Sequence, residues 1–327
     1  MDKNFKFDLQ LFGDYDQYVS RTNVASMIPQ EVSNEIIKGL PAESVVLSLF
    51  KRAPDMTRKQ LTLPVNSVLP QAYFTSGDTG LRKTTSAEWT DKYIYAEELN
   101  AIVPIPVSVI EDAEYDMWEQ IKPLLMQALG KTIDLAAIFG TNKPTNWPTA
   151  IVTAATSASN TVTYGTNPDI ADDVGGVDGL MSLVEADGYD VNGFAADISL
   201  KSYFRGLRSA DGTPIFQQAL SANTPATLYG QPIFYPKNGG WTKTSALLIA
   251  GDFSKAIYSM RKDITYKILD QAVITDAAGA VVINLPQQGM IALMVTMRLG
   301  WQVPNPVNAL NEVEASRYPF AVLLPAS

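Results

Sequence analysis

The stretch SVIEDAEYDMWEQIKPLLMQALGKTIDLAAIFG, from Ser108 to Gly140, decides how the chain is organised. Its apolar residues recur close to the period of an α-helix, at Ile110, Ala113, Met117, Ile121, Leu124, Ala128 and Ile133. Ser108 and Glu111 have the spacing of a capping box, and Gly140 supplies a stop signal. A helix of this length would be a rod of about 45 Å, which predicts a spine that carries separate lobes.

Pro123 lies inside this stretch and removes one helical hydrogen bond. Two structures are compatible with it: two helices split at Pro123, or one continuous helix that bends. We expect the continuous helix because the apolar spacing stays in phase from Ile121 through Leu124 to Ala128.

The composition is typical of a folded protein. The chain has 327 residues, enough for one large domain or two ordinary ones, of which 46% are hydrophobic and 18% charged. No run approaches the roughly 18 apolar residues of a membrane span, so we expect no membrane association.

The chain contains no cysteine and no histidine. Disulfides, thiolate nucleophiles, the usual zinc sites and the commonest acid–base side chain are therefore excluded. We expect no enzyme activity, no catalytic or metal-binding residues and no cofactor. The net charge of −9 also argues against a sequence-independent nucleic-acid binder, which needs a basic face.

Three local patterns superficially suggest a binding site. Residues 140–143 lack the second glycine and the Lys-Ser/Thr pair of a phosphate loop, so a helix end is the better interpretation. A group of acidic residues fits a solvated face near a helix N-terminus better than a metal site; it consists of Glu111, Asp112, Glu114 and Asp116. A scattered basic group, partly balanced by Asp55, favours a solvated or interface role over nucleic-acid contact; it consists of Lys51, Arg52, Arg58 and Lys59.

Residues 1–23 have the pattern of an arm. Phe5, Phe7, Leu9 and Leu11 alternate with polar residues, which is the period of a β-strand. Such a strand has no neighbour in the sequence and tends to pair elsewhere, here on another chain; a disordered terminus is the alternative. We predict that Phe7, Leu9 and Leu11 contact a neighbouring subunit.

Residues 55–100 predict a long two-stranded ribbon. Strand-like stretches at 60–65 and 91–106 flank a polar, glycine-rich tip at 76–80. Isolated ribbons are marginally stable in water, so this one should rest either on a neighbouring subunit or on its own domain. We favour the neighbour and predict that Tyr73, Phe74 and Trp89 make the contact.

The remainder alternates between helix and strand signals. Residues 148–176 read as a linker with one strand at 161–164. Beyond it we expect helices at 177–187 and 199–208 and strands at 194–198, 228–235, 246–249, 263–269 and 281–285. These predict an α+β lobe with a central sheet. The last strands, within 290–310 and 319–325, should pair with the strands that flank the spine.

A series of short motifs runs through the chain. In chain order they are Ile28-Pro29, Glu35-Ile36-Ile37, Glu43-Ser44-Val45-Val46, the ribbon ending in Trp89, Ala96-Glu97-Glu98-Leu99, the segment from Ile102 to Asp116, Ile133-Asp134-x-Ala136, Phe139-Gly140-Thr141, Leu228-x-Gly230-x-Pro232, Gly251-Asp252-Phe253-Ser254 and Met297-Arg298-x-Gly300-Trp301. Each motif is weak alone, but their order and spacing cover essentially the whole chain. In this order of parts the chain resembles the tailed-bacteriophage major capsid proteins of the Hong Kong 97-like fold.

The resemblance implies an α+β subunit in six parts. They are an N-terminal arm (1–23), a first part of the peripheral domain (24–54), an extended loop (55–100), the peripheral domain with its spine helix (101–150), an axial domain with a central sheet (151–285), and C-terminal strands of the peripheral domain (286–327). It also implies a structural protein that assembles itself through pentamers and hexamers into an icosahedral phage head. The head would enclose double-stranded DNA without sequence-specific contact.

Scaffold and portal proteins are the further partners that the resemblance implies, in a virion capsid assembled in the host cytoplasm. The long N-terminal scaffold segment of some members is absent from this sequence, so we expect a separate scaffold protein or an earlier cleavage. Self-cross-linking members use a Lys, an Asn and a Glu. Lys83 lies in the corresponding loop, but the other two residues have no placed counterpart, so we transfer no such chemistry.

Two alternatives remain compatible with these observations. An encapsulin-type compartment has the same fold and encloses cargo enzymes instead of DNA. An unrelated carboxylate enzyme would be a monomer or small oligomer with a closed pocket.

Overall fold

The computed structural model describes residues 44–75, 80–113, 116–208, 227–276 and 278–326. The chain divides into two compact units, of which the first contains Asn100–Leu125 and Ile264–Met297. The second contains Pro41–Leu99, Met126–Asp263 and Arg298–Ser327. The predicted arm, with Phe7, Leu9 and Leu11, lies outside the described residues.

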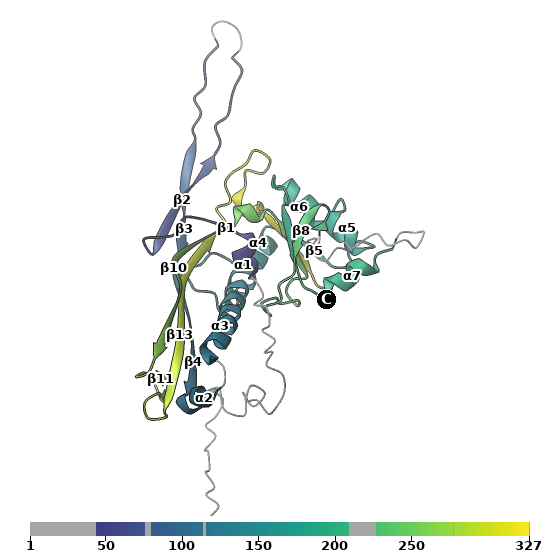
Figure 1. The fold of residues 1–327 in the computed structure, drawn as a ribbon. Helices are drawn as coiled ribbons and strands as arrows, with labels where there is room; N and C mark the ends of the chain where they lie inside the picture. Colours follow the sequence, from purple (N-terminus) through teal and green to yellow (C-terminus); the bar gives the residue numbers. More distant parts are fainter. Residues whose placement is uncertain (1–43, 76–79, 114–115, 209–226, 277, 327) are drawn as a thin grey trace, which may run out of the picture. The chain divides into compact units, whose positions relative to one another are not determined.

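The predicted spine consists of two helices, α2 (Val107–Asp112) and α3 (Met117–Asp134) (Figure 1). The residue at the N-cap of α2 is Pro106, so the predicted capping by Ser108 is wrong. Ala113 has an extended conformation (φ −76°, ψ 130°), which ends α2. The Asp116 carboxylate then accepts a hydrogen bond from the Trp118 amide at 2.9 Å and caps the start of α3.

Helix α3 continues through Pro123, as the spacing predicted. Its buried residues recur every four positions, at Met117, Ile121, Leu125, Leu129 and Ile133. Burial along this stripe offsets the backbone hydrogen bond that proline cannot make. A π-helical turn, η1 (Leu135–Phe139), follows, and Gly140 ends it with a φ of 78°, in the left-handed region that favours glycine.

A six-stranded sheet forms the core of the second unit. Its order is β5-β14-β9-β6-β8-β7, made by Thr161–Thr163, Phe320–Leu324, Leu248–Gly251, Gly193–Ala196, Gln231–Phe234 and Thr227–Leu228. The helices of this lobe are α4 (Ile151–Ser157), α5 (Ile170–Gly175), α6 (Leu180–Ala186) and α7 (Leu200–Gly206) (Figure 1). Leu180, Phe194 and Phe204 are completely buried between sheet and helices. The predicted α+β lobe with a central sheet is therefore present.

The predicted linker at 148–176 is wrong, because two helices, α4 and α5, lie within it, but the strand predicted there at 161–164 is present as β5. Ile151 and Ala155 are both buried on α4, and Ile170 and Val174 repeat the same spacing on α5. Small residues surround these positions and make the helical period hard to recognise in the sequence. Burial of the apolar positions against the sheet is nevertheless sufficient to stabilise both helices.

The final strand lies inside the six-stranded sheet. In β14, Val322 lies opposite Ile249 of β9 in an antiparallel pair and opposite Thr161 of β5 in a parallel pair. Because β5 is the next strand after the spine, this pairing agrees with the expectation that the last strands pair with strands that flank the spine. Residues 320–323 are all buried, so both faces of β14 are covered. A continuous apolar run such as FAVLL is typical of a strand inside a sheet.

A second, four-stranded sheet has the order β1-β10-β13-β4. Its strands are Lys51–Arg52, Ile257–Leu269, Met290–Gln302 and Glu97–Pro106. Strand β13 therefore neighbours β4, which leads into the spine, as predicted. The predicted strand at 263–269 belongs to β10 in this sheet, and that at 281–285 corresponds to β12 (Val281–Asn284), which pairs with β11 (Val273–Thr275). Neither joins the six-stranded sheet.

Gly300 on β13 permits a close approach of two backbones. A Cβ atom at this position would lie 2.2 Å from the carbonyl oxygen of Tyr95. We expect Gly300→Ala to lower the free energy of unfolding by about 1–3 kcal/mol because the strand must shift to relieve the overlap. Thermal unfolding of dissociated subunits measures the change. Gly206→Ala is the control, since a Cβ there meets nothing within 4 Å; equal melting temperatures for the two variants would contradict the prediction.

Candidate assembly surface

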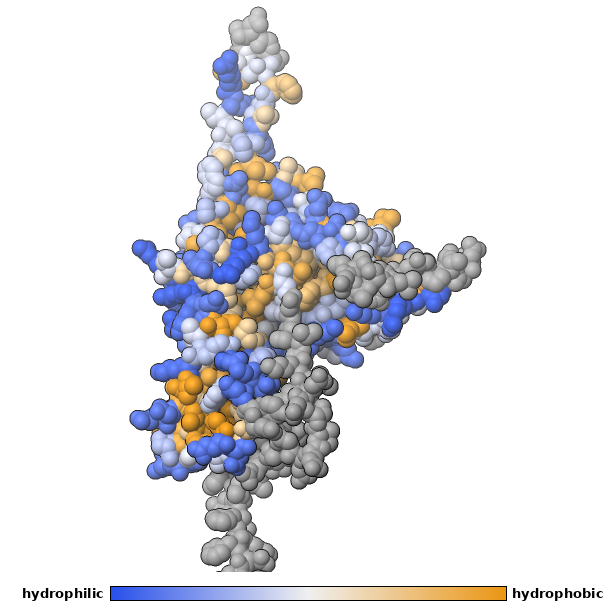
Figure 2. Space-filling model, viewed as in Figure 1, coloured by the Kyte–Doolittle hydropathy of each residue, from blue (hydrophilic) through white to orange (hydrophobic). Residues whose placement is uncertain are grey.

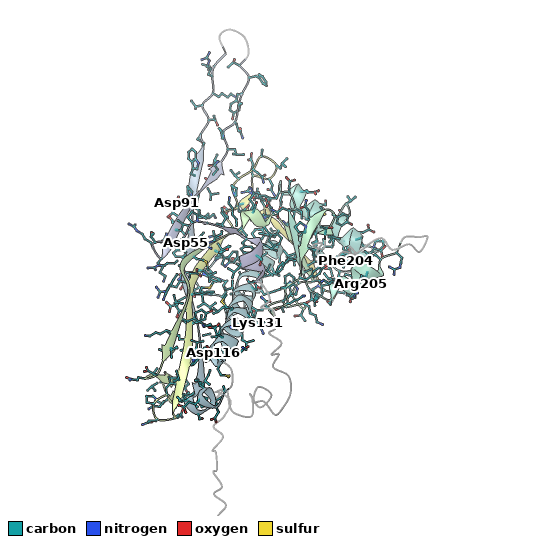
Figure 3. The ribbon with its side chains drawn as sticks, viewed as in Figure 1. Asp55, Asp91, Asp116, Lys131, Phe204 and Arg205 are labelled. Carbon is teal, nitrogen blue, oxygen red and sulfur yellow. The ribbon has the colours of Figure 1, made fainter. Side chains whose placement is uncertain are left out.

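The ribbon predicted at 55–100 is formed by β2 (Gln60–Val68) and β3 (Glu88–Tyr95). The strands are antiparallel, with Gln60 opposite Tyr95 and Val68 opposite Glu88. Asp91, labelled in Figure 3, lies opposite Pro64. Outside the paired strands, the Gln71 amide donates a hydrogen bond to the Thr85 hydroxyl at 2.9 Å. The ribbon thus has a paired base and a tip, 69–87, with few internal bonds among its described residues.

The base of the ribbon rests on its own subunit. Met56, Ile94 and Ala96 are buried in a small cluster against which Leu61, Leu63 and Ile257 pack. Three polar contacts attach the strands to the C-terminal segment: Lys92 Nζ to Glu314 Oε1 at 2.6 Å, Gln302 Nε2 to the Tyr93 carbonyl at 3.1 Å, and the Val307 amide to the Asn66 carbonyl at 3.0 Å. For the base, the alternative of a strand pair folded onto its own domain is therefore correct.

The tip and the end of the paired strands next to it are different, because their large apolar side chains lie in solvent. Phe74 is fully exposed, Trp89 at the start of β3 is 66% exposed, and Tyr73 is 49% exposed. Leu81, 91% exposed, belongs to the same group and was missed because a single leucine in a polar tip gives no periodic signal. Figure 2 shows the ribbon as a mainly hydrophilic surface with few hydrophobic side chains. Exposed aromatic groups on a segment with little core of its own are typical of a contact surface.

Lys83 contacts an aromatic ring of the tip. Its Nζ lies 5.0 Å from the centre of the Tyr73 ring, and the Tyr73 hydroxyl donates to Gln71 Oε1 at 2.9 Å. The cation–π contact orders the aromatic side chain within the tip. Within the described residues, Lys83 therefore packs against the Tyr73 ring.

A buried carboxylate joins three segments of the second unit. Asp134 accepts hydrogen bonds from the Ser44 hydroxyl at 2.5 Å and from the Val45 and Val46 amides at 3.1 Å each. Asn238 Nδ2 donates to the same carboxylate at 2.6 Å. Asp134 thus binds the first turn of α1 (Val45–Leu49), whose N-cap residue is Ser44, and it connects two of the motifs on which the family resemblance rests.

Burial raises the pKa of the Asp134 carboxyl, while hydrogen bonds from Ser44, Asn238 and the Val46 and Val45 amides act in the opposite direction. Because the raised pKa belongs to the folded state, the unfolded chain loses this proton first as pH rises. The stabilisation by the neutral form is complete below about pH 4, the unfolded pKa, and is lost as pH rises through the folded pKa.

Asp134→Asn removes this titration and so tests its sign. The free energy of unfolding of the unaltered protein, minus that of the variant, should decrease as pH rises from about 4. Chemical denaturation of dissociated subunits across this range measures it. A difference that grows with pH would contradict the raised pKa.

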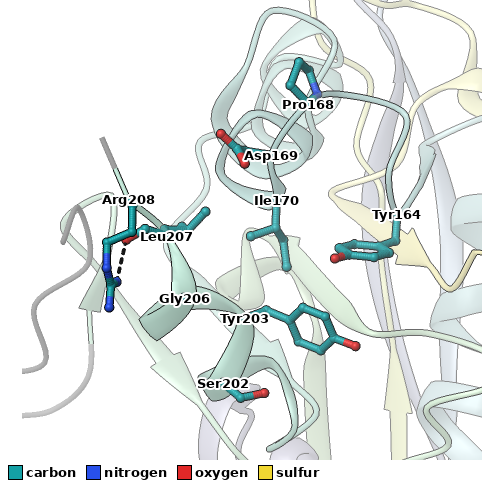
Figure 4. Close-up of a pocket in the computed structure, with 9 residues that line it drawn as sticks. All are labelled: Tyr164, Pro168, Asp169, Ile170, Ser202, Tyr203, Gly206, Leu207 and Arg208. Carbon is teal, nitrogen blue, oxygen red and sulfur yellow. Dashed lines mark hydrogen bonds between the residues drawn. The ribbon is translucent and has the colours of Figure 1, made fainter. Parts of the chain in front are cut away.

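A shallow pocket of about 530 Å³ lies between α5 and α7 (Figure 4). Its lining includes Tyr164, Asp169, Ser202, Tyr203 and Arg208. The Ser202 hydroxyl donates to the Ser199 carbonyl at 2.7 Å, so it is not oriented by a general base. Among the described residues that line the pocket, Ser202 is therefore not part of the nucleophile–base pair of a hydrolase.

The remaining sequence patterns take ordinary structural positions. Glu111, Asp112 and Asp116 are exposed, and within the described residues no three acidic side chains gather in a way that could hold a metal ion. Lys143 Nζ donates to the carbonyls of Pro144 and Trp147 beyond the helix end. Among the helices that the structure describes, none is long and apolar enough to span a membrane.

Comparisons with known proteins agree with this architecture. A family model described as the phage capsid family matches residues 24–311. The major capsid protein of Staphylococcus phage 80alpha is 25% identical over 278 residues, which cover 84% of this chain and 80% of that protein. A solved chain from Microbacterium phage Oxtober96 is 34% identical with a TM-score of 0.79, covering 95% of this chain and all of the other. One from Mycobacterium phage Adephagia is 28% identical with a TM-score of 0.78, covering 95% and 99%.

These likenesses extend over the ribbon, the spine and the sheet lobe together, and they confirm the α+β fold of the Hong Kong 97 type that the order of motifs predicted. They give no support to the encapsulin-type alternative. The chain belongs to the phage capsid family and is a structural major capsid protein, not an enzyme.

Proposed function

We propose that copies of this subunit join into rings of five and six, and that these rings close into the icosahedral head. The ribbon carries the proposal, since its base is anchored while Phe74 and Leu81 in the tip and Trp89 beside it are exposed. When the tip of one subunit binds a different surface of the next subunit, the contact is heterologous. Repeated contacts of this kind close into a ring when the rotation between neighbouring copies is a full turn divided by a whole number. The arm residues Phe7, Leu9 and Leu11 would add a strand to a neighbour.

Within the subunit we assign the parts as the resemblance implied. The arm is 1–23, the extended loop 55–100 and the axial domain 151–285, with the peripheral domain made from 24–54, 101–150 and 286–327. The six-stranded sheet supports an axial domain, although its strand β14 comes from the last of these segments. Axial domains would meet around the five-fold and six-fold axes.

The head would enclose double-stranded DNA without sequence-specific contact. The net charge of −9 supports this, because an acidic inner wall repels phosphates and lets the genome pack without adhering. Scaffold and portal proteins would be the further partners, and assembly would take place in the host cytoplasm.

Electron microscopy of the purified protein tests the proposal. We expect rings of five and six subunits and closed shells, with nuclease-protected DNA in particles taken from infected cells. Stable monomers under every condition that assembles related shells would contradict it. Shells that contain copurifying enzymes in place of DNA would instead identify a cargo compartment.

A further inference from the structure

Six exposed cations line one edge of the second unit. The segment after α1 runs along β10: the Ala53 amide donates to the Tyr258 carbonyl at 2.8 Å, and the Met56 amide donates to the Met260 carbonyl at 2.7 Å. This pairing brings the basic group noticed in the sequence beside two further cations that follow on β10. We call the set the basic strip: Lys51, Arg52, Arg58, Lys59, Arg261 and Lys262, all exposed.

Most of this charge is not neutralised locally. Arg52 pairs with Asp55 at 2.9 Å and Lys59 lies 3.9 Å from Glu97. Asp55 is labelled in Figure 3. Among the described residues, no ion pair within 4.0 Å engages Lys51, Arg58, Arg261 or Lys262. Six cations against Asp55, Glu97 and Asp263 leave the strip with a charge of about +3, on a chain whose net charge is −9.

The sheet lobe carries the opposite charge. Between Lys143 and Lys201 the sequence contains eight acidic residues and no Lys or Arg. Asp173 and Asp187 are buried and bind backbone amides. Four others are exposed on α5, on α6 and in the loops that follow them; we call them the acidic face: Asp172, Asp178, Glu185 and Asp190. No ion pair in the described part of the chain engages these four carboxylates.

We propose that the basic strip of one subunit binds the acidic face of a second copy. The inference rests on the proposed assembly into rings, because each copy then offers one strip and one face and every contact is repeated around the ring. Opposite charges at such a contact speed association, fix the register of the copies and disfavour wrong pairings.

A second copy fits the strip better than nucleic acid does. Asp55, Glu97 and Asp263 are interleaved with the cations and would repel phosphate groups, while carboxylates of a protein partner can be spaced to avoid them. If the strip bound nucleic acid, the acidic face on the same chain would also be left unexplained. Val177, 90% exposed beside Asp178, offers an apolar contact between the charges.

Charge reversal on each side, alone and together, tests the inference. The strip variant is Arg261→Glu with Lys262→Glu, and the face variant is Asp172→Lys with Asp178→Lys. Each should raise the protein concentration needed for ring formation more than about tenfold at 0.15 M NaCl, and the quadruple variant should return it to within about threefold of the unaltered protein. Sedimentation velocity measures association, and thermal unfolding checks that each dissociated subunit is folded.

The control makes the same charge change elsewhere: Lys237→Glu with Lys243→Glu, both exposed and outside the strip. It should leave association unchanged, whereas 1 M NaCl should weaken ring formation of the unaltered protein. A quadruple variant no better than the doubles, or a control as defective as the strip variant, overturns the inference. So does a strip variant that assembles normally but retains less DNA. If the unaltered protein never forms rings, the proposed assembly itself fails.

Discussion

Replacing Tyr73, Phe74 and Trp89 together with serine should abolish shell formation while the dissociated subunit stays folded. The three side chains are 49%, 107% and 66% exposed, so they contribute little to the core of an isolated subunit. Against a neighbour, each aromatic group would instead be buried, and a few such residues commonly carry most of an interface's binding energy. Electron microscopy detects shells, and thermal unfolding shows whether the dissociated subunit is folded. The unfolding experiment must use dissociated subunits, because assembly itself raises the apparent stability.

A conservative triple variant is the matched control. Tyr73→Phe, Phe74→Leu and Trp89→Phe keep most of the apolar area and should still assemble, at a higher protein concentration. If the serine variant unfolds as a monomer, the three side chains belong to the subunit's own core and the ribbon assignment is wrong.

Removal of the tip separates its role from that of the base. Val68 lies opposite Glu88, so a short glycine turn can replace 69–87 and leave the paired strands intact. This variant should fold and remain unassembled. A longer deletion, Ser67–Lys92, would also remove the contact of Lys92 with Glu314, and we expect it to cost stability that the shorter deletion does not.

Asp134→Ala should be among the most destabilising single substitutions in the chain, at about 3–5 kcal/mol of unfolding free energy. It would leave the Ser44 hydroxyl, two backbone amides and the Asn238 side chain without their buried acceptor. The N-cap residue of helix α1, Ser44, would keep its contact with the Leu47 amide, so the loss measures the buried acceptor itself. Denaturant unfolding of dissociated subunits measures the loss.

Two milder variants make this prediction specific to the buried acceptor. Ser44→Ala removes one donor and should cost only about 1 kcal/mol. Asp134→Asn keeps one acceptor oxygen and should lie between Ser44→Ala and Asp134→Ala. Equal losses for all three variants would mean that packing around Asp134, and not its hydrogen bonds, determines the effect.

How far the sequence predicts this structure depends on whether the signal is local. Pro123 was correctly placed inside a continuous helix, although the buried stripe passes through Ile121 and Leu125 and the predicted stripe residue Leu124 is 64% exposed. The break before α3 was missed because Ala113 and Met117 continue the apolar period across it. Only the cap, Asp116 with Glu119 three residues later, marks the new start, and the predicted cap at Ser108 concealed it.

Pairing between distant segments was harder to predict. The strand character of 320–324 is evident, but no local sequence pattern indicates that Val322 pairs with Ile249 and Thr161. The ribbon shows the same limit, since its alternating strands were recognisable while the contact of Lys92 with Glu314, 222 residues away, was not. Which strands pair with one another depends on burial in the complete fold, and a single sequence carries no local signal for this pairing.

The place of β14 in its sheet has a consequence for synthesis. It lies between β5 and β9, although the ribosome makes it after both of them. Until residues 320–324 emerge, the nascent lobe has two open strand edges, on β5 and β9, where its second strand belongs, and open edges invite pairing with the wrong chain. Closing the sheet also requires contacts between segments far apart in the sequence, which makes folding slow. A chain on which residues 320–324 have not yet been made therefore lacks a completed lobe to contribute to a ring.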